Sequence, residues 1–490
     1  MLYHSSRNRD LKANSREAIV KGLASDGGLF VSHDALTTSL MDPALLTETY
    51  QETAQRVFGH FLNDFTPEEI AKAVNSAYDV KFADARIAPL SRVGHEYLLE
   101  LYHGPTSAFK DMALSILPWF MSFALESMGK KVMIVTATSG DTGKAALEAF
   151  QDVPNVGIAV LYPHRKVSEI QRLQMATQRG DNVAVFAIEG NFDDAQTAAK
   201  TLFNEADRIT LPEGVDFSSA NSINIGRLIP QVVYYFQAYK QLLEEKALAY
   251  GEAFDVCVPT GNFGNILAGY YARACGLPIR RMIVASNQNH VLTDFLATGT
   301  YDRRRDFHKT ITPSMDILIS SNLERLLYEM SGGDCELIAS LMKQLKEEGH
   351  YQVSPELLAK IQSVFEGAWA DDEKTAACIR EAWEKDHRLI DPHTAVALAV
   401  AREKAQDDVP CVVLSTASPY KFAYDVLAAL GAEVPADPFE AMALLERLTG
   451  TTAPKNLSEL KRLPVRFDGS IAVNDVPTAV VDAANRIFKA

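Results

Sequence analysis

The order of apolar and polar positions along the chain predicts a protein built on parallel β-sheets. Short apolar runs rich in valine and isoleucine alternate with segments of helical periodicity. This pattern is typical of parallel strands joined by crossover helices. The expected strands are 132–136, 156–162, 183–188 and the later runs DVCVP, RMIVAS and CVVLST. We therefore expect an α/β fold with parallel sheets.

Two long parts of the chain lack this strand pattern. The first part has mainly helical periodicity around a turn at Gly27 and Gly28, and a later part is helical and rich in charge. The predicted units are an N-terminal helical region (1–85), an α/β core (86–300, with a smaller domain at about 130–215), a helical subdomain or insertion (301–390) and a C-terminal return to the larger domain (391–490).

Length and charge narrow the class of protein. A chain of 490 residues with 47% hydrophobic residues is too long for one ordinary core, so two or three domains are expected. The formal net charge of -15, with no basic run to offset it, disfavours binding to nucleic acids or to anionic membranes. The most apolar helical stretch, Ile116 to Leu125, is too short to span a bilayer and contains Pro118, so we expect a buried helix there.

The N-terminus and the cysteines indicate a cytoplasmic protein. The first ten residues lack the apolar segment of a signal peptide. The five cysteines are widely spaced and lack the paired spacing of a zinc or dithiol site, which fits a reducing compartment and predicts no metal site.

Three junctions between a strand and a helix carry candidate chemistry: TSGDTG, PTGNFGN and STASPYKF. Loops at the carboxyl ends of parallel strands converge on the ligand crevice, so the three are expected to share one site. The loop of Gly261, Asn262, Phe263, Gly264 and Asn265 presents backbone amides at a helix N-terminus, which suits a phosphate group. The alternative is an ordinary tight turn between a strand and a helix.

The TSGDTG junction has the same context and adds hydroxyl groups. Ser139, Gly140, Asp141 and Thr142 are suited to binding a small carboxylate through amides and hydroxyls. The alternative is a capped helix start with no ligand.

Lys110 is a candidate reactive lysine. A helix that begins near Ser107 would place Lys110, Leu114 and Leu117 on one apolar face. Desolvation there would lower the pKa of the ammonium group towards a neutral amine that can condense with an aldehyde. The alternative is a lysine on a solvated helix face, and His103 nearby is given no role.

Taken together, the segments resemble the threonine synthase family. The segments that carry the resemblance are GLASDGGLF (22–30), LYHGPTSAFKD around Lys110, TSGDTG, YPHRKVSEIQRLQM (162–175), EGNFDDAQ (189–196), SANSINIGRLIPQVVYYF (219–236), PTGNFGN, TPSMDI (312–317) with SNLERLL, DPHTA (391–395) and STASPYKF (415–422). They cover nearly the whole chain in family order. Ser107, Ile225 and Ser418 depart from residues common in the family, which leaves pocket packing and fine selectivity open.

The resemblance implies fold type II of the pyridoxal 5'-phosphate enzymes, which is similar to the tryptophan synthase β subunit, with the cofactor between two α/β domains. It implies that Lys110 binds the cofactor as a Schiff base, that the amides of 261–265 hold its phosphate, and that Thr416 faces its pyridine nitrogen. The implied reaction converts O-phospho-L-homoserine and water to L-threonine and phosphate.

The substrate contacts implied by the resemblance are less defined. The substrate carboxylate would meet the loop from Ser139 to Thr142, and Ser222, Asn224 and Arg227 would bind the substrate phosphate or shape its pocket. A structural ion pair is the alternative for Arg227.

Two other functions share these features. One is a related lyase that eliminates phosphate from the same substrate and releases a keto acid. The other is a binding or regulatory protein that kept the fold without catalysis, against which the presence of Lys110 and the phosphate loop argue. The oligomeric state is left open.

Overall fold

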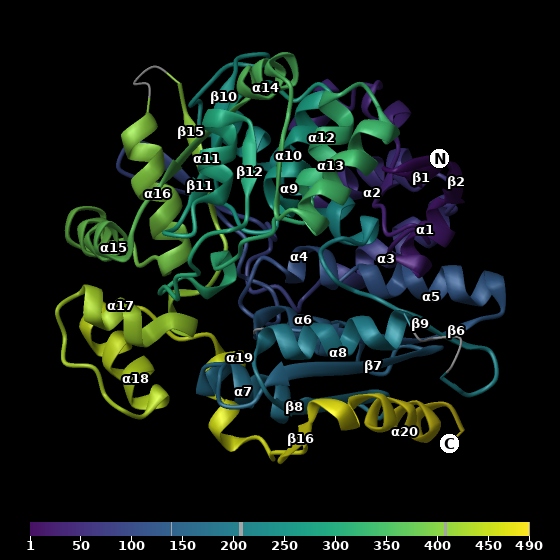
Figure 1. Cartoon of the computed structure of the whole chain (residues 1–490). Coiled ribbons are helices and arrows are strands. Elements are labelled where there is room, and N and C mark those ends of the chain that lie inside the picture. The colour runs from purple at the N-terminus through teal and green to yellow at the C-terminus, as the bar shows by residue number, and fades with distance from the viewer. Residues whose placement is uncertain (139, 205–208, 406–408, 490) are drawn as a thin grey trace.

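The computed structural model describes residues 1–138, 140–204, 209–405 and 409–489. The chain folds into two α/β lobes, each around its own sheet (Figure 1). The α/β class with parallel sheets is confirmed. No helix in the described residues combines the length and the apolar character needed to cross a membrane.

The larger lobe contains a six-stranded sheet in which only the edge strand β4 runs antiparallel to its neighbour. In order across the sheet, the strands are β14 (Phe365–Trp369), β11 (Ile279–Ser286), β10 (Phe254–Pro259), β15 (Cys411–Ser415), β5 (Glu96–Glu100) and β4 (Leu90–Val93). The inner strands β10 and β15 are buried along their whole length, as expected of parallel strands with both faces covered. The helices of this lobe include α9 (Ile225–Glu244), α10 (Gly264–Ala274), α11 (Val291–Thr298), α15 (Asp372–Asp386), α16 (Pro392–Lys404), α17 (Ala423–Ala429) and α18 (Pro438–Thr449).

The smaller lobe contains a five-stranded parallel sheet. In order, its strands are β16 (Ser470–Ala472), β8 (Val183–Glu189), β7 (Val156–Pro163), β6 (Lys131–Ala137) and β9 (Val215–Ser218). Its helices are α6 (Asp141–Phe150), α7 (Glu169–Ala176), α8 (Phe192–Asn204) and the C-terminal α20 (Val476–Lys489). The strands predicted at 132–136, 156–162 and 183–188 are confirmed as β6, β7 and β8.

The C-terminal segment is divided between the lobes, which corrects the expectation that all of 391–490 returns to the larger one. Strand β15 lies between β10 and β5 in the larger sheet, but β16 pairs with β8 in the smaller sheet. Helix α20 packs its apolar face on the same sheet through Val476 and Val480, both fully buried. A three-residue strand such as β16 carries too little periodicity to be recognised in the sequence.

The N-terminal region was expected to be mainly helical, but it begins with a three-stranded antiparallel sheet. The strands, in order across the sheet, are β2 (Asn8–Asn14), β1 (Leu2–Ser5) and β3 (Phe30–Val31). Helix α1 (Ser15–Lys21) lies between β2 and β3 in the sequence, and α2 (Tyr50–Phe61) and α3 (Pro67–Ala77) follow β3. Strand β2, NRDLKAN, is largely exposed and contains one large apolar side chain, Leu11, so its alternation is too weak to identify a strand.

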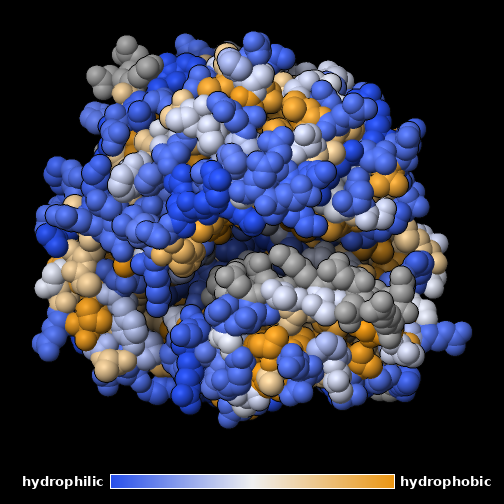
Figure 2. Space-filling model, viewed as in Figure 1, coloured by the Kyte–Doolittle hydropathy of each residue, from blue (hydrophilic) through white to orange (hydrophobic). Residues whose placement is uncertain are grey.

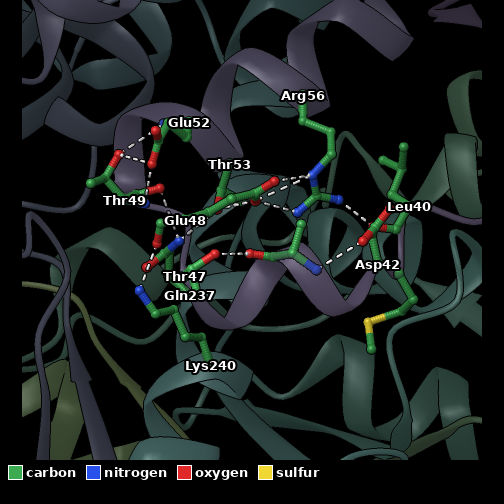
Figure 3. A network of polar contacts seen from close by, with 12 residues as sticks. Leu40, Asp42, Thr47, Glu48, Thr49, Glu52, Thr53, Arg56, Gln237 and Lys240 are labelled. Atoms are coloured by element: carbon green, nitrogen blue, oxygen red, sulfur yellow. Dashed lines mark hydrogen bonds and ion pairs between the residues drawn. The ribbon is translucent and has the colours of Figure 1, made fainter.

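A polar network ties the N-terminal region to helix α9 (Figure 3). The Glu48 carboxylate accepts hydrogen bonds from Thr53 at 2.9 Å and from Arg56, whose guanidinium also donates to the Leu40 carbonyl. From α9, Gln237 donates to the Thr53 hydroxyl at 2.7 Å and Lys240 donates to the Glu48 carbonyl at 2.6 Å. The hydrogen bonds from Gln237 and Lys240 thus fix the position of α2 on α9, and the Glu48 carboxylate and carbonyl both have hydrogen-bond partners.

The segment 301–390 is more than the expected helical subdomain or insertion. It contains the hairpin β12 (Thr300–Asp302) and β13 (His350–Gln352), the helices α12 (Leu323–Met330), α13 (Cys335–Glu347) and α14 (Pro355–Gln362), and β14. Because β14 pairs with β11, this segment completes the edge of the larger sheet.

The predicted buried helix at 116–125 is confirmed as α5 (Leu117–Met128). Pro118 lies in its first turn, where a missing amide hydrogen costs nothing. Helix α5 ends at Gly129, which adopts the left-handed conformation that favours glycine (φ 62°).

The N-terminal region also depends on a nearly buried ion pair. Arg7 donates two hydrogen bonds of 2.8 Å to Glu324 at the start of α12, and Ser6 donates a third. The Glu324 side chain is only 5% exposed. We expect Arg7→Ala to lower the free energy of unfolding by about 1 to 3 kcal/mol, because it leaves a nearly buried carboxylate without its cation. Urea unfolding measures the loss.

The matched control is Arg86→Ala. Arg86 makes the same two-pronged contact with Asp84, but its side chain is 60% exposed. Exposed ion pairs contribute less than about 1 kcal/mol. Equal losses in the two variants would contradict the importance assigned to the Arg7–Glu324 pair.

Candidate functional site

The segment that carries Lys110 meets two of the predicted loops, TSGDTG and STASPYKF, at the boundary between the two lobes. The segment after β5 contacts the segment after β15, since Phe109 N–H donates to the Thr416 carbonyl at 2.8 Å and Ser418 N–H donates to the Ser107 carbonyl at 3.1 Å. The Lys110 ammonium of the larger lobe lies 3.8 Å from the carboxylate of Asp141, the first residue of α6 in the smaller lobe. The space-filling view shows a hollow between the lobes (Figure 2). Of the three loops expected to share one site, TSGDTG and STASPYKF are brought together, since Lys421 Nζ lies 2.7 Å from the Asp141 carboxylate. That PTGNFGN shares this site stays a prediction.

Lys110 does not lie inside a helix that begins near Ser107, and this expectation was wrong. Ser107 adopts a left-handed conformation (φ 58°), and Lys110 is the residue before the one-turn helix α4 (Asp111–Leu114). The carboxylate of Asp111 accepts hydrogen bonds from the amide and the hydroxyl of Thr106, at 2.8 and 2.6 Å. This local ring of hydrogen bonds folds the GPTSAFKD segment back on itself, so an amphipathic helix was the wrong template.

Lys110 is nevertheless a buried lysine, although charged side chains as well as an aromatic ring surround its ammonium group. Its side chain is 11% exposed, and its ammonium group lies 4.9 Å from the centre of the Phe109 ring. Burial lowers the pKa of Lys110, and the positive charges of Lys421 and Arg227 lower it further, whereas Asp141 raises it. Lys110 is thus a lysine poised to lose its proton more readily than an exposed one.

Asp141 is a buried carboxylate whose two oxygens are both occupied. One oxygen lies 2.7 Å from the Lys421 ammonium and accepts a 3.1 Å hydrogen bond from Gln171, and the other faces Lys110. Burial alone would raise the pKa of Asp141, but Lys421 and Lys110 together hold it well below its ordinary value. Asp141 is therefore ionised and serves as the anion of this site.

Some backbone amides of the TSGDTG junction are engaged in hydrogen bonds within the junction itself. Ser139 lies outside the described residues. The amides of Gly140 and Gly143 both donate to the Thr138 hydroxyl, at 3.0 and 2.9 Å. Gly140 has a backbone angle (φ 143°) that favours glycine, and a Cβ there would meet Gln171 at 2.4 Å. A ligand at this loop is thus left with Thr142 and the first-turn amides of α6.

The loop from Gly261 to Asn265 has the geometry of an anion cradle. It leaves buried strand β10 and enters α10 through Phe263, which is 1% exposed and left-handed (φ 62°). Among the described residues, no acceptor is found for the amides of Gly261, Asn262 or Phe263. A Cβ at Gly261 would lie 2.8 Å from the Ser314 carbonyl, so only glycine fits there. The amides of Gly264 and Asn265 begin a helix and lack intrahelical partners.

Buried polar side chains hold this loop from behind. Asn322 contacts the Asn262 carbonyl through its backbone amide (3.1 Å) and its side chain (3.0 Å). Arg325, which is fully buried, donates to the Asn322 side chain and to the carbonyls of Phe30 and Ile223. The loop is therefore braced by the SNLERLL segment, which is itself packed on the N-terminal region.

The side-chain NH2 group of Asn265 has no hydrogen-bond acceptor among the described residues. The carbonyl oxygen of the Asn265 side chain accepts hydrogen bonds from Tyr234 and Tyr235, at 2.6 and 3.0 Å. Its Nδ2 is buried and has no acceptor among the described residues. An unpaired buried donor costs free energy unless a ligand accepts its hydrogen bond.

Thr416 follows β15, and its backbone is fixed on both sides. Its amide donates to the Thr394 hydroxyl at 3.3 Å, and its carbonyl accepts from Phe109. Thr394 in turn donates to Asp391, the residue that caps α16 and that also contacts the His393 ring at 2.8 Å. The Thr416 side chain makes no hydrogen bond with the described residues, so its hydroxyl is available to a ligand.

The SANSINIGRL segment contributes one buried cation. Arg227 is 4% exposed and donates to the Ala220 carbonyl at 2.7 Å, while its Nε has no partner among the described residues. Burial lowers the pKa of Arg227 to about 10. Asn224 is the cap of α9 and its side chain is fully used by the backbone at Ile19, Ser219 and Gly226. Ser222 is partly buried and its carbonyl accepts from Asn322.

Two polar side chains of the site were not singled out from the sequence. Lys421 lies within STASPYKF, and only its position after β15 connected it with the other loops. Gln171 lies in α7 and reaches Asp141 from another part of the smaller lobe. His103, which was given no role, pairs with Glu100 at 2.8 Å.

The chain is similar to known proteins over nearly its whole length. Family models match it as "Threonine synthase N terminus" over residues 2–78, "Pyridoxal-phosphate dependent enzyme" over 86–416 and "Threonine synthase, C-terminal" over 394–468. It is 39% identical to the threonine synthase of Pseudomonas aeruginosa over 94% of this chain and 97% of that one. It is 40% identical to human threonine synthase-like 1 over 84% of this chain, and it spans only 58% of the length of that protein.

Solved structures of threonine synthases superpose on nearly the whole chain. The PLP-bound threonine synthase of Brucella melitensis superposes with a TM-score of 0.88 at 37% identity, with 99% of each chain covered. The yeast threonine synthase superposes with a TM-score of 0.87 at 30% identity, with 98% of each chain covered. The predicted fold type II architecture is confirmed.

Asp111 should make the stability of the chain depend on pH. Burial raises the pKa of Asp111 from 3.8 to about 6, although Thr106 and Lys421 favour its ionised form. The folded chain thus holds this proton more tightly than the unfolded chain, and its stability should fall as the pH rises from about 4 to about 6. At about 1.4 kcal/mol per pH unit the loss amounts to at most about 3 kcal/mol.

The comparison that isolates this effect is with Asp111→Asn, which has no proton to lose. Urea unfolding of both proteins between about pH 4 and pH 7 should show the variant gaining stability relative to the wild type by up to about 3 kcal/mol. Parallel stability curves over that range would show that Asp111 has an ordinary pKa.

Proposed function

This chain belongs to the threonine synthase family of pyridoxal-phosphate dependent enzymes, and we propose that it converts O-phospho-L-homoserine and water to L-threonine and phosphate. The observation that carries the proposal is the buried Lys110 at the boundary of the lobes, facing the ionised Asp141. That pair stands in a chain that matches family members of known structure from end to end.

The residues present fit pyridoxal 5'-phosphate, the cofactor of this family. The amides from Gly261 to Asn265 would hold the cofactor phosphate, and the unpartnered Asn265 Nδ2 is a buried donor in the same loop. The free hydroxyl of Thr416 would face the pyridine nitrogen, to which a hydroxyl can either donate or accept a hydrogen bond. When bound, the cofactor supplies an electron sink for negative charge that develops on the substrate carbons.

Lys110 would hold the cofactor covalently and then move protons. Its lowered pKa favours a neutral amine, which is the form that bonds to an aldehyde and that accepts a proton from carbon. We assign it the removal of the α and β protons of the substrate, after which phosphate leaves from the γ carbon and water adds at the β carbon. Lys110 would also return protons to the γ and α carbons, which balances the conversion to threonine and phosphate. The partly closed position between the lobes keeps bulk water away from the amine.

The substrate groups would contact the two remaining segments. Arg227 is the candidate for the substrate phosphate, because its Nε is a buried donor with no acceptor in the described part of the chain and a guanidinium matches two phosphate oxygens. Ser222 would shape the same pocket, while Asn224 would act through the backbone that it caps. The substrate carboxylate is assigned to the loop from Ser139 to Thr142, through Thr142 and the first-turn amides of α6.

We also propose a cytoplasmic location. It is supported by the five cysteines, all of which are free thiols, four of them buried. No partner beyond the small-molecule substrate is proposed.

The direct test is product analysis with O-phospho-L-homoserine. We expect purified protein to form threonine and phosphate in equal amounts. Lys110→Ala should lose at least about two orders of magnitude in rate, because the group that moves the protons is gone. Phosphate accompanied by a keto acid would instead identify the related lyase, and cofactor-loaded protein with no turnover would contradict the proposal.

The phosphate loop can be tested separately through Gly261. A side chain at this position displaces the loop from the Ser314 carbonyl, so we expect Gly261→Val to weaken cofactor binding at least about tenfold, or about 1.4 kcal/mol. Equilibrium titration of the cofactor-free protein with pyridoxal phosphate measures this affinity.

The control is Gly59→Ala on α2, where a Cβ would meet no atom within 4 Å. It should leave cofactor affinity unchanged. Thermal unfolding of the cofactor-free proteins completes the comparison. If Gly261→Val loses apo stability in proportion to affinity, the loop is only a structural turn.

A further inference from the structure

Asp141 is shared unequally by two buried lysines. Lys421 Nζ lies 2.7 Å from one carboxylate oxygen, and Lys110 Nζ lies 3.8 Å from the other. The Lys421 side chain is 1% exposed and that of Lys110 is 11% exposed. Lys421 is therefore the close partner of the carboxylate, and Lys110 is the looser one.

Lys421 is also fixed by a second contact. It lies in a single turn, Pro419–Phe422, directly after the loop of Thr416, and it donates to the Thr106 carbonyl at 3.2 Å. Thr106 is held in turn by its two hydrogen bonds to Asp111. Lys421 thus joins the segment that carries Lys110 to the first turn of α6, and the Thr106 carbonyl helps to hold its ammonium beside Asp141.

Removing the Lys421 charge would change the partner of Asp141. A buried carboxylate that loses its cation is destabilised strongly, so it recruits the next available cation. The nearest remaining ammonium is that of Lys110. A lysine drawn into a tight buried ion pair stays protonated, and a protonated amine does not attack an aldehyde.

We propose that Lys421 is a positioning residue that occupies Asp141 and thereby leaves the Lys110 amine loosely paired and available for bonding to an aldehyde. The functional meaning of this inference rests on the proposed role of Lys110 as the cofactor-binding lysine. The inference itself concerns the chain's own side chains and can be measured without the cofactor.

The charged groups around Lys110 act on its pKa in opposite directions. Burial lowers the pKa of Lys110, and Lys421 and Arg227 lower it further, whereas Asp141 and Asp111 raise it. Loss of Lys421 removes one of the positive charges that lower the pKa of Lys110. It also leaves Lys110 as the remaining cationic partner of Asp141. Both changes raise the pKa of Lys110.

The experiment measures the reactivity of Lys110 in the full-length chain freed of cofactor. Reductive methylation with formaldehyde and cyanoborohydride, followed by peptide mass spectrometry, gives the rate at Lys110 as a function of pH. We expect Lys421→Met to move the midpoint of this profile upward by at least about one pH unit, which slows methylation about tenfold at neutral pH. Lys421→Arg keeps a cation at this position and should stay within about twofold of the wild type.

A reference lysine and a second variant distinguish a change at Lys110 from a general change in the fold. Lys385, whose side chain is 69% exposed, should react equally in all variants. Asp141→Asn removes the carboxylate and should move the Lys110 midpoint downward, which also keeps the inference testable if Lys421→Met fails to fold. An unchanged midpoint in folded Lys421→Met, or an upward shift in Asp141→Asn, would overturn the inference.

The outcome is independent of the proposed function. The predicted shift in a chain that forms no threonine supports the inference and contradicts the proposed function. Threonine formation by the wild type together with an unshifted Lys110 profile supports the function and overturns the inference.

Discussion

Asp141 remains ionised inside the protein because the ammonium groups of Lys421 and Lys110 face it from the opposite lobe. This buried ionic contact joins α6 of the smaller lobe to two segments of the larger lobe. It fixes both the distance between the lobes and the charge at their boundary. Without it, Lys110 would be a desolvated lysine with no defined counter-ion, and the loops that converge there would lack a common reference point.

The N-terminal region belongs to the same arrangement because it braces the candidate phosphate loop. Arg325 connects the carbonyl of Phe30 to Asn322, and Asn322 holds the Asn262 carbonyl of the candidate phosphate loop. Arg7 and Glu324 fasten the start of the same helix to the first strands. The loop is thus held rigidly from behind while its amides stay free in front, which is the arrangement that a preorganised anion site requires.

The sequence predicted the parts of this structure that depend on local pattern. Buried parallel strands such as β6, β7 and β8 have continuous apolar runs, and the loops after β10 and β15 have glycines and hydroxyls at strand ends. The helix expected from Ser107 failed because a side chain, Asp111, closes a turn that competes with the helix. The periodicity of apolar residues gives no information about such side-chain hydrogen bonds.

The remaining misses depended on contacts between distant segments. Strand β16 has three residues and is recognised by its pairing with β8, and β2 is largely exposed with one large apolar side chain. Lys421 and Gln171 belong to the site because they contact Asp141, which lies in a different segment of the sequence from either. No single segment carries a signal for a buried charge cluster, because each member resembles an ordinary polar residue until the fold brings them together.

We propose that Lys110, and not its buried neighbour Lys421, is the lysine that carries the cofactor. Both ammonium groups contact the same carboxylate, so the claim needs a covalent test. Borohydride reduction of the cofactor-loaded protein, followed by proteolysis and mass spectrometry, locates the reduced adduct. The structure predicts an adduct on Lys110 alone, because Lys421 is held by Asp141 and the Thr106 carbonyl. An adduct on Lys421 or on any other lysine would contradict this account of the site.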